Sequence, residues 1–181
     1  DFDRVLELKP DYLEAILNRG NRLQNLSKFP EAINDYSHAI ELSPDDARTY
    51  LLRAHARLRL KTYGLPTIDA AAGKQEESAE IAEVDYAAAL ADYEKAVSIT
   101  AAYSEAWRGI SLIHKTHGRY DRALEAMSKA IELEPASAVN FVRRGELHRE
   151  TGNYAAAHDD LDEAETLNPK LGAAIIERGK V

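Results

Sequence analysis

The sequence contains no cysteine, which excludes disulfide bonds, thiolate catalysis and cysteine metal sites. No stretch approaches the roughly 18 apolar residues that a membrane-spanning helix needs, and no signal-like apolar run opens the chain. Acidic residues outnumber basic ones, and the resulting net charge of −8 argues against binding to nucleic acid or to a membrane. We expect a cytoplasmic protein, with the periplasm or an organelle as alternatives.

Sequence signs of catalysis are also missing. We find no nucleophile-elbow motif, no strand pattern and no glycine-rich phosphate loop. The stretch HKTH places His114 and His117 one helical turn apart, which could hold a metal ion. However, His114 falls in a core position of the repeat described below, and His117 ends a helix. We therefore expect no enzyme activity, no cofactor and no metal.

One short phrase is written five times, and its spacing predicts the fold. It begins at Phe2, Tyr36, Tyr93, Met127 and Leu161, in forms such as YSHAIELSP and MSKAIELEP. Three of the four steps are 34 residues and the other is longer by 23. A fixed period of this length is typical of a solenoid of helical hairpins, in which each hairpin buries its apolar face against the next.

Aligned at this period, the chain shows columns of similar residues with distinct roles. Small residues allow two helix axes to approach closely, large apolar residues fill the spaces between hairpins, and proline ends the second helix. The small column contains Gly20, Ala54, Ser111, Gly145 and Gly179. The large column contains Ile16, Tyr50, Trp107, Phe141 and Ile175, and the proline column contains Pro10, Pro44, Ala101, Pro135 and Pro169.

Together with the recurring aromatic residue and the two alanine columns, this pattern resembles the tetratricopeptide repeat. The resemblance implies an all-α, right-handed superhelical solenoid of antiparallel helix pairs. We divide the chain into a second-helix remnant at 1–12, repeats at 13–46, 47–103, 104–137 and 138–171, and a further first helix or cap at 172–181. Ala101 departs from the family proline, and Arg57, His114 and His148 stand where an aromatic residue is usual.

The extra 23 residues fall at about 62–84, inside the repeat at 47–103. Gly64, Pro66 and Gly73 interrupt the start of this insertion, and helix-forming residues follow. We expect the second helix of the repeat to begin early, near Gln75. A tolerated surface excursion and a partner-binding or self-docking element are both open interpretations.

Arginine occupies one column of the first helices, at Arg19, Arg53, Arg144 and Arg178, and aspartate occupies one column of the second helices, at Asp35, Asp92 and Asp160. The repeat that lacks the arginine has Ile110 there, and it has Ala126 in place of the aspartate. This agreement favours structural ion pairs within each hairpin. A ladder of arginines that binds phosphate or carboxylate is the alternative.

The resemblance further implies that the first helices line a concave groove that binds an extended segment or a helix. The groove residues that we expect are Asn18, Asn21, Arg48, Leu51, Leu52, His55, Arg59, Arg108, Leu112, Lys115, Val142, Arg143 and Arg149. Basic residues exceed acidic ones on this face by about three, so we expect a protein or peptide partner with acidic and apolar residues. Merely solvated helix faces are the alternative.

Two known uses of the family do not match these positions. The clamp for the C-terminal carboxylate of heat-shock chaperones is matched by Asn21 alone. The asparagine ladder of O-linked N-acetylglucosamine transferase is matched by Asn18 alone. We therefore expect a non-catalytic interaction scaffold. The alternatives are a regulatory or substrate-recruiting arm of a multidomain enzyme and a module that self-associates through its ends, for which GAAII at 172–176 is suited.

Overall fold

The computed structural model describes residues 2–62 and 75–171, with side chains at 2–60 and 86–171, and every regular element in these ranges is an α-helix. The chain divides into a unit that spans residues 1–100 and a unit that spans residues 101–181. The predicted all-α helical-repeat solenoid is confirmed by the helix content and by the structural comparisons reported below.

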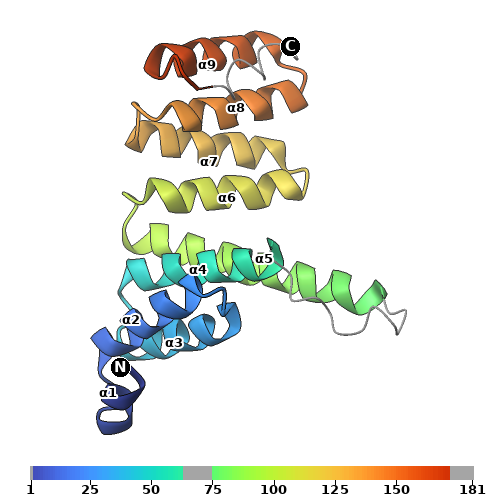
Figure 1. The fold of residues 1–181 in the computed structure, drawn as a ribbon. Helices are drawn as coiled ribbons and strands as arrows, with labels where there is room; N and C mark the ends of the chain where they lie inside the picture. The colour runs from blue at the N-terminus through green and yellow to red at the C-terminus, as the bar shows by residue number, and fades with distance from the viewer. Residues whose placement is uncertain (1, 63–74, 172–181) are drawn as a thin grey trace. The chain divides into compact units, whose positions relative to one another are not determined.

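The first unit contains α1 (Phe2–Leu8), α2 (Leu13–Asn25), α3 (Phe29–Leu42), α4 (Ala47–Thr62) and α5 (Gln75–Ile99). Helix α2 packs on α3, and α4 packs on α5, so each pair forms a hairpin (Figure 1). Helix α3 also packs against α4, which joins the two hairpins. The second unit contains α6 (Ser104–Thr116), α7 (Tyr120–Leu133), α8 (Ala138–Glu150) and α9 (Tyr154–Leu167), arranged in the same way.

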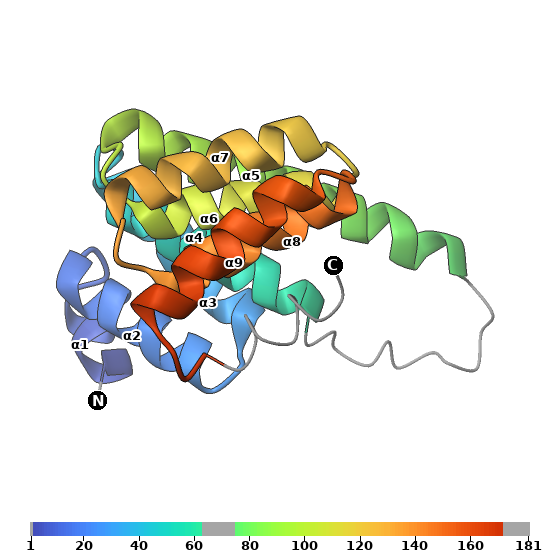
Figure 2. The same ribbon diagram turned by 90° about the horizontal axis from the view of Figure 1, so that it is seen from above.

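Helix α5 begins at Gln75, as the sequence predicts. It has 25 residues against 16 in α4, and its N-terminal turns extend beyond α4 in both views (Figures 1 and 2). The Gly- and Pro-containing stretch at 63–74 lies outside the described residues. In the described part of the chain, no helix has the length and apolar character needed to cross a lipid bilayer.

The turns inside three hairpins share one backbone motif. In the first, the amide of Lys28 donates to the carbonyl of Leu23, and Ser27 between them has a φ of +59°. The amide of Arg119 donates to the carbonyl of His114, and Gly118 between them has a φ of +68°. Asn153 donates to the carbonyl of His148 in the same way, with Gly152 at +78°. This is the left-handed ending of a helix that glycine favours, because a Cβ atom is strained there.

Every second helix that the structure describes ends at the equivalent residue. Helices α3, α7 and α9 end at Leu42, Leu133 and Leu167, two residues before a proline. Helix α5 ends at Ile99 although Ala101 replaces the proline. The proline is therefore not required for this ending.

Small residues lie where the two helices of a hairpin cross. Gly20 on α2 faces the ring of Tyr36, and an added Cβ atom would lie 2.8 Å from Cε1 of that ring. Tyr36 is fully buried, and its hydroxyl donates to Oδ1 of Asn21 at 2.9 Å. The crossing at Gly145 is less tight, because an added Cβ atom would meet its nearest neighbours at 3.4 Å. The small column thus has the packing role that its pattern indicates.

Candidate interaction surface

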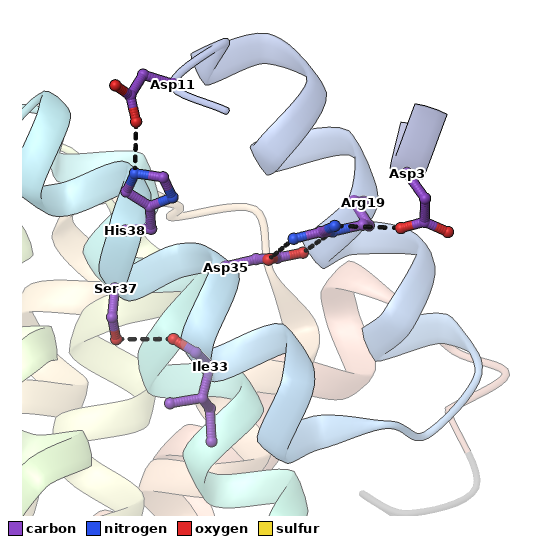
Figure 3. Close-up of polar contacts among 7 residues, drawn as sticks. All are labelled: Asp3, Asp11, Arg19, Ile33, Asp35, Ser37 and His38. Atoms are coloured by element: carbon purple, nitrogen blue, oxygen red, sulfur yellow. Dashed lines mark hydrogen bonds and ion pairs between the residues drawn. The ribbon is translucent and has the colours of Figure 1, made fainter. Parts of the chain in front are cut away.

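The arginine column forms ion pairs within the hairpins, as the sequence predicts. Arg19 donates from Nε and Nη2 to the two carboxylate oxygens of Asp35, at 2.8 and 2.6 Å (Figure 3). Arg53 and Asp92 form the same two-point contact, at 2.9 and 2.7 Å. The three aspartates of this column are buried, and Ile110 and Ala126 are buried in the repeat that lacks the pair.

Each arginine also reaches a residue sixteen positions earlier, on the second helix of the preceding hairpin. Arg19 donates to Asp3 at 3.1 Å, as Figure 3 shows, and Arg53 donates to the hydroxyl of Ser37 at 3.0 Å. Arg144 donates to Ser128 at 3.3 Å. The arginines therefore join neighbouring hairpins as well as closing their own. Because the guanidinium groups of Arg19, Arg53 and Arg144 already donate hydrogen bonds on both sides, these three arginines do not form an open ladder for a ligand. The fourth residue of the column, Arg178, lies outside the described residues.

Both units have a hollow between successive first helices. The unit-two hollow, of about 340 Å³, lies between α6 and α8, and it is lined by Arg108, Leu112, Lys115, Arg143, Glu146 and Glu150 among others. The unit-one hollow, of about 390 Å³, lies between α2 and the start of α4, and it is lined by Glu14, Leu17, Asn18, Asn21, Asp46, Arg48 and Leu52 among others. Eight of the expected groove residues thus line one of these two hollows.

Five expected groove residues do not line these two hollows. Leu51 and Val142 are only 6% and 5% exposed, so they offer less open apolar surface than we expected, although Val142 lines a smaller hollow with Val139 and Arg143. His55 is half-buried, with its ring edge-on to Tyr93. Arg59 is exposed, and Arg149 is half-buried.

The two hollows differ in charge, although the sequence suggested one basic face. Three basic residues and two acidic ones line the unit-two hollow, whereas Arg48 alone stands against Glu14 and Asp46 in the unit-one hollow. Asp46 is already engaged, because its carboxylate accepts hydrogen bonds from the amide of Arg48 and the hydroxyl of Thr49 at the start of α4. The positive character therefore gathers in the unit-two hollow.

The three cations of the unit-two hollow are not equally available. Arg108 donates to Glu134 at 2.9 Å. Lys115 lies 3.4 Å from Glu146 and 3.0 Å from Glu150, and the sequence analysis predicted neither contact. Arg143 is exposed and makes no hydrogen bond or ion pair with the residues that the structure describes. Among the described residues, Arg143 is thus the cation of this hollow that has no charged partner.

Comparisons with known proteins agree with this architecture. A family profile described as "TPR repeat" matches residues 20–61, and one described as "Tetratricopeptide repeat" matches residues 104–137. Tetratricopeptide repeat protein 6 from Homo sapiens is 27% identical over 154 residues, which cover 80% of this chain and 30% of that protein. The chain spans about 30% of the length of the first relatives that it matches.

Two solved structures share the fold. The crystal structure of MamA superposes with a TM-score of 0.76 at 19% identity and covers 93% of this chain and 85% of its own. The first TPR of Spaghetti (RPAP3), bound to an HSP90 peptide, superposes with a TM-score of 0.62 at 18% identity and covers 77% of this chain and 93% of its own. The chain is a helical-repeat solenoid, and it belongs to the tetratricopeptide-repeat family. Proteins of this family and fold are generally protein-interaction modules without catalytic activity.

Proposed function

We propose that this chain is a non-catalytic scaffold whose unit-two hollow binds a peptide segment with a carboxylate next to apolar side chains. The observation that carries this proposal is Arg143, an exposed guanidinium at the rim of a hollow that makes no hydrogen bond or ion pair with the described residues. Two exposed apolar side chains flank the site: Leu112 on α6 is 41% exposed, and Val139, one turn before Arg143 on α8, is 47% exposed. Val139 and Arg143 also line a smaller hollow beside the first one.

The chemistry of these groups favours an acidic–apolar segment. A guanidinium forms its strongest hydrogen bonds with carboxylates, and its planar fork fits both oxygens of one carboxylate. An apolar side chain of the peptide that covers Leu112 and Val139 would remove apolar surface from water and so favour binding. The peptide complex of the Spaghetti repeat supports the choice of a peptide as ligand, because it shows that the fold can hold one. We also propose that this peptide ligand is an acidic–apolar segment of a protein and that the chain binds it in the cytoplasm.

Fluorescence anisotropy with three matched peptides tests the proposal. The first is a short labelled peptide in which Asp-Leu pairs are separated by Ser, and it is called here the acidic–apolar probe. In the other two peptides, Asn or Lys replaces each Asp. We expect a micromolar dissociation constant for the acidic–apolar probe, or about −8 kcal/mol, and weaker binding as salt screens the charges.

The charge reversal Arg143→Glu identifies the site. We expect it to weaken binding of the acidic–apolar probe about tenfold or more, because it replaces an attraction to carboxylate with a repulsion. Arg122→Glu is the matched control, since Arg122 is an exposed arginine on α7 of the same unit that does not line the hollow. Equal loss in both variants, or a preference for the Lys peptide, would overturn the proposal.

A further inference from the structure

Arg143 and Glu146 lie three residues apart on α8, and both line the unit-two hollow. Opposite charges at this spacing face the same side of a helix and commonly pair. Here they do not pair. Glu146 instead accepts a hydrogen bond from Nζ of Lys115 on α6, at 3.4 Å, and Arg143 has no such contact with the described residues.

Lys115 makes this arrangement by crossing from α6 to α8. Its ammonium also lies 3.0 Å from Glu150, so it is shared between two carboxylates one turn apart. The three side chains are 29–33% exposed, so water screens their attraction only partly. Burial lowers the pKa of Lys115, but its hydrogen bond to Glu150 and the negative charge of Glu146 outweigh the burial and leave the pKa raised. Lys115 therefore remains a cation at neutral pH.

We propose that Lys115 is a positioning residue that keeps Arg143 available. By holding Glu146 toward α6, it prevents the pair that Glu146 and Arg143 would otherwise form on α8. This inference rests on the proposed function in one respect, because it takes the carboxylate of a bound peptide as the group that Arg143 contacts. The state of Arg143 in the free protein is a separate matter and can be measured without a partner.

Removing the ammonium isolates the effect. Lys115→Met keeps most of the apolar stem and releases both carboxylates. Glu146 then lies within reach of Arg143, whereas Glu150, seven residues from Arg143, lies two turns away along the helix. A surface pair at three-residue spacing stabilises a helix by a few tenths of a kcal/mol, which corresponds to about a twofold change in the unpaired population of Arg143.

Phenylglyoxal modification, measured by mass spectrometry, tests directly whether Arg143 is paired. The reagent reacts with the deprotonated guanidine, and a bound carboxylate slows this reaction because it favours the protonated guanidinium. Arg122 in the same digest serves as the internal reference. We expect the rate for Arg143, relative to Arg122, to fall about twofold in Lys115→Met. Adding Glu146→Gln should restore the wild-type ratio, and adding Glu150→Gln should leave it low. Loss of local structure would raise the ratio, which is the opposite sign.

An unchanged ratio in Lys115→Met, or equal restoration by the two glutamine substitutions, would overturn the inference. Titration of the same variants with the acidic–apolar probe separates this inference from the proposed function. Binding that is insensitive to Arg143→Glu contradicts the proposed function and leaves the modification result standing. Binding that is lost in Arg143→Glu but unchanged in Lys115→Met contradicts the positioning role of Lys115 alone.

Discussion

Arg144 on α8 donates from Nε to Oδ2 of Asp160 at 2.9 Å and from Nη2 to Oδ1 at 2.7 Å, and so it closes the α8–α9 hairpin with a two-point ion pair. The side chain of Asp160 is 7% exposed and that of Arg144 is 24% exposed. A pair this deeply placed is weak evidence for net stability, because desolvation offsets the attraction. Removing one partner is costly because the other charge is left with little water.

Substitution of this pair should therefore be strongly non-additive. We expect Asp160→Ala to lower the free energy of unfolding by about 2–4 kcal/mol, since it leaves Arg144 unpaired. Arg144→Ile in the same chain should recover part of that loss, because the repeat with Ile110 and Ala126 packs apolar side chains at these positions. Urea unfolding of the double-mutant cycle measures the coupling. Asp159→Ala, an exposed neighbour, is the control and should change stability by less than about 0.5 kcal/mol. Additive losses would contradict the pairing.

The two glycine crossings should respond differently to one methyl group. At Gly20 an added Cβ atom lies 2.8 Å from the Tyr36 ring, which is fully buried and held by its hydroxyl bond to Asn21. We expect Gly20→Ala to destabilise the first unit by about 1–3 kcal/mol through overpacking. Gly145→Ala meets only ordinary contacts of 3.4 Å or more, and alanine favours the helix, so it should be neutral or stabilising by up to about 1 kcal/mol. Urea unfolding followed by circular dichroism gives the free energy of unfolding of both variants. Equal losses of stability would contradict the closer packing at Gly20.

Buried His114 predicts a loss of stability in mild acid. Burial is the main cause that lowers its pKa, and Arg119, Arg122 and His117 add to the effect, whereas Glu125 opposes it. Because the folded pKa lies below the unfolded value of about 6.5, the unfolded chain takes up the proton first. The contribution of His114 is therefore fully present above the unfolded pKa and is lost as the pH falls through it toward the folded pKa.

Two histidine variants test the contribution of His114 to the pH dependence of stability. In His114→Leu the slope of unfolding free energy against pH between about 7 and 5 should be reduced. Nδ1 of His114 has no hydrogen-bond partner among the described residues, so no bond at that atom is sacrificed. His158→Leu, at an exposed position, should keep the wild-type slope. A slope that is unchanged in His114→Leu would mean that other groups carry the acid sensitivity.

Much of the fold follows from the sequence because the 34-residue period assigns each residue a fixed place on a helix. The Arg19–Asp35 pair and the apolar residues Ile110 and Ala126 that replace it in another repeat were predicted in this way. The start of α5 at Gln75 was predicted instead from the helix-forming residues in the insertion. A column gives the direction of a side chain within its own hairpin. It does not give the approach of the preceding hairpin, and for that reason the contact of Arg53 with Ser37 was not foreseen.

The candidate site was less predictable, for two physical reasons. Leu51 and Val142 are buried, and Val142 lies in a core cluster with Leu161 and Ala164 of α9, which a repeat alignment does not show. Whether a cation can contact a ligand depends on whether it already forms an ion pair with a neighbouring side chain. From the sequence alone, Lys115 could have been assigned to a ligand as easily as to Glu146 and Glu150. The sequence located the basic residues, but the choice of Arg143 needed the side-chain contacts.

The most direct test of the central claim is a titration of the ¹⁵N-labelled protein with the acidic–apolar probe, followed by amide chemical shifts. We expect the largest shifts on the first helices of the second unit, around Leu112 on α6 and Arg143 on α8, and we expect them to disappear in Arg143→Glu but persist in Arg122→Glu. Shifts that centre instead on α7 and α9, or that survive in Arg143→Glu, would contradict binding in the unit-two hollow.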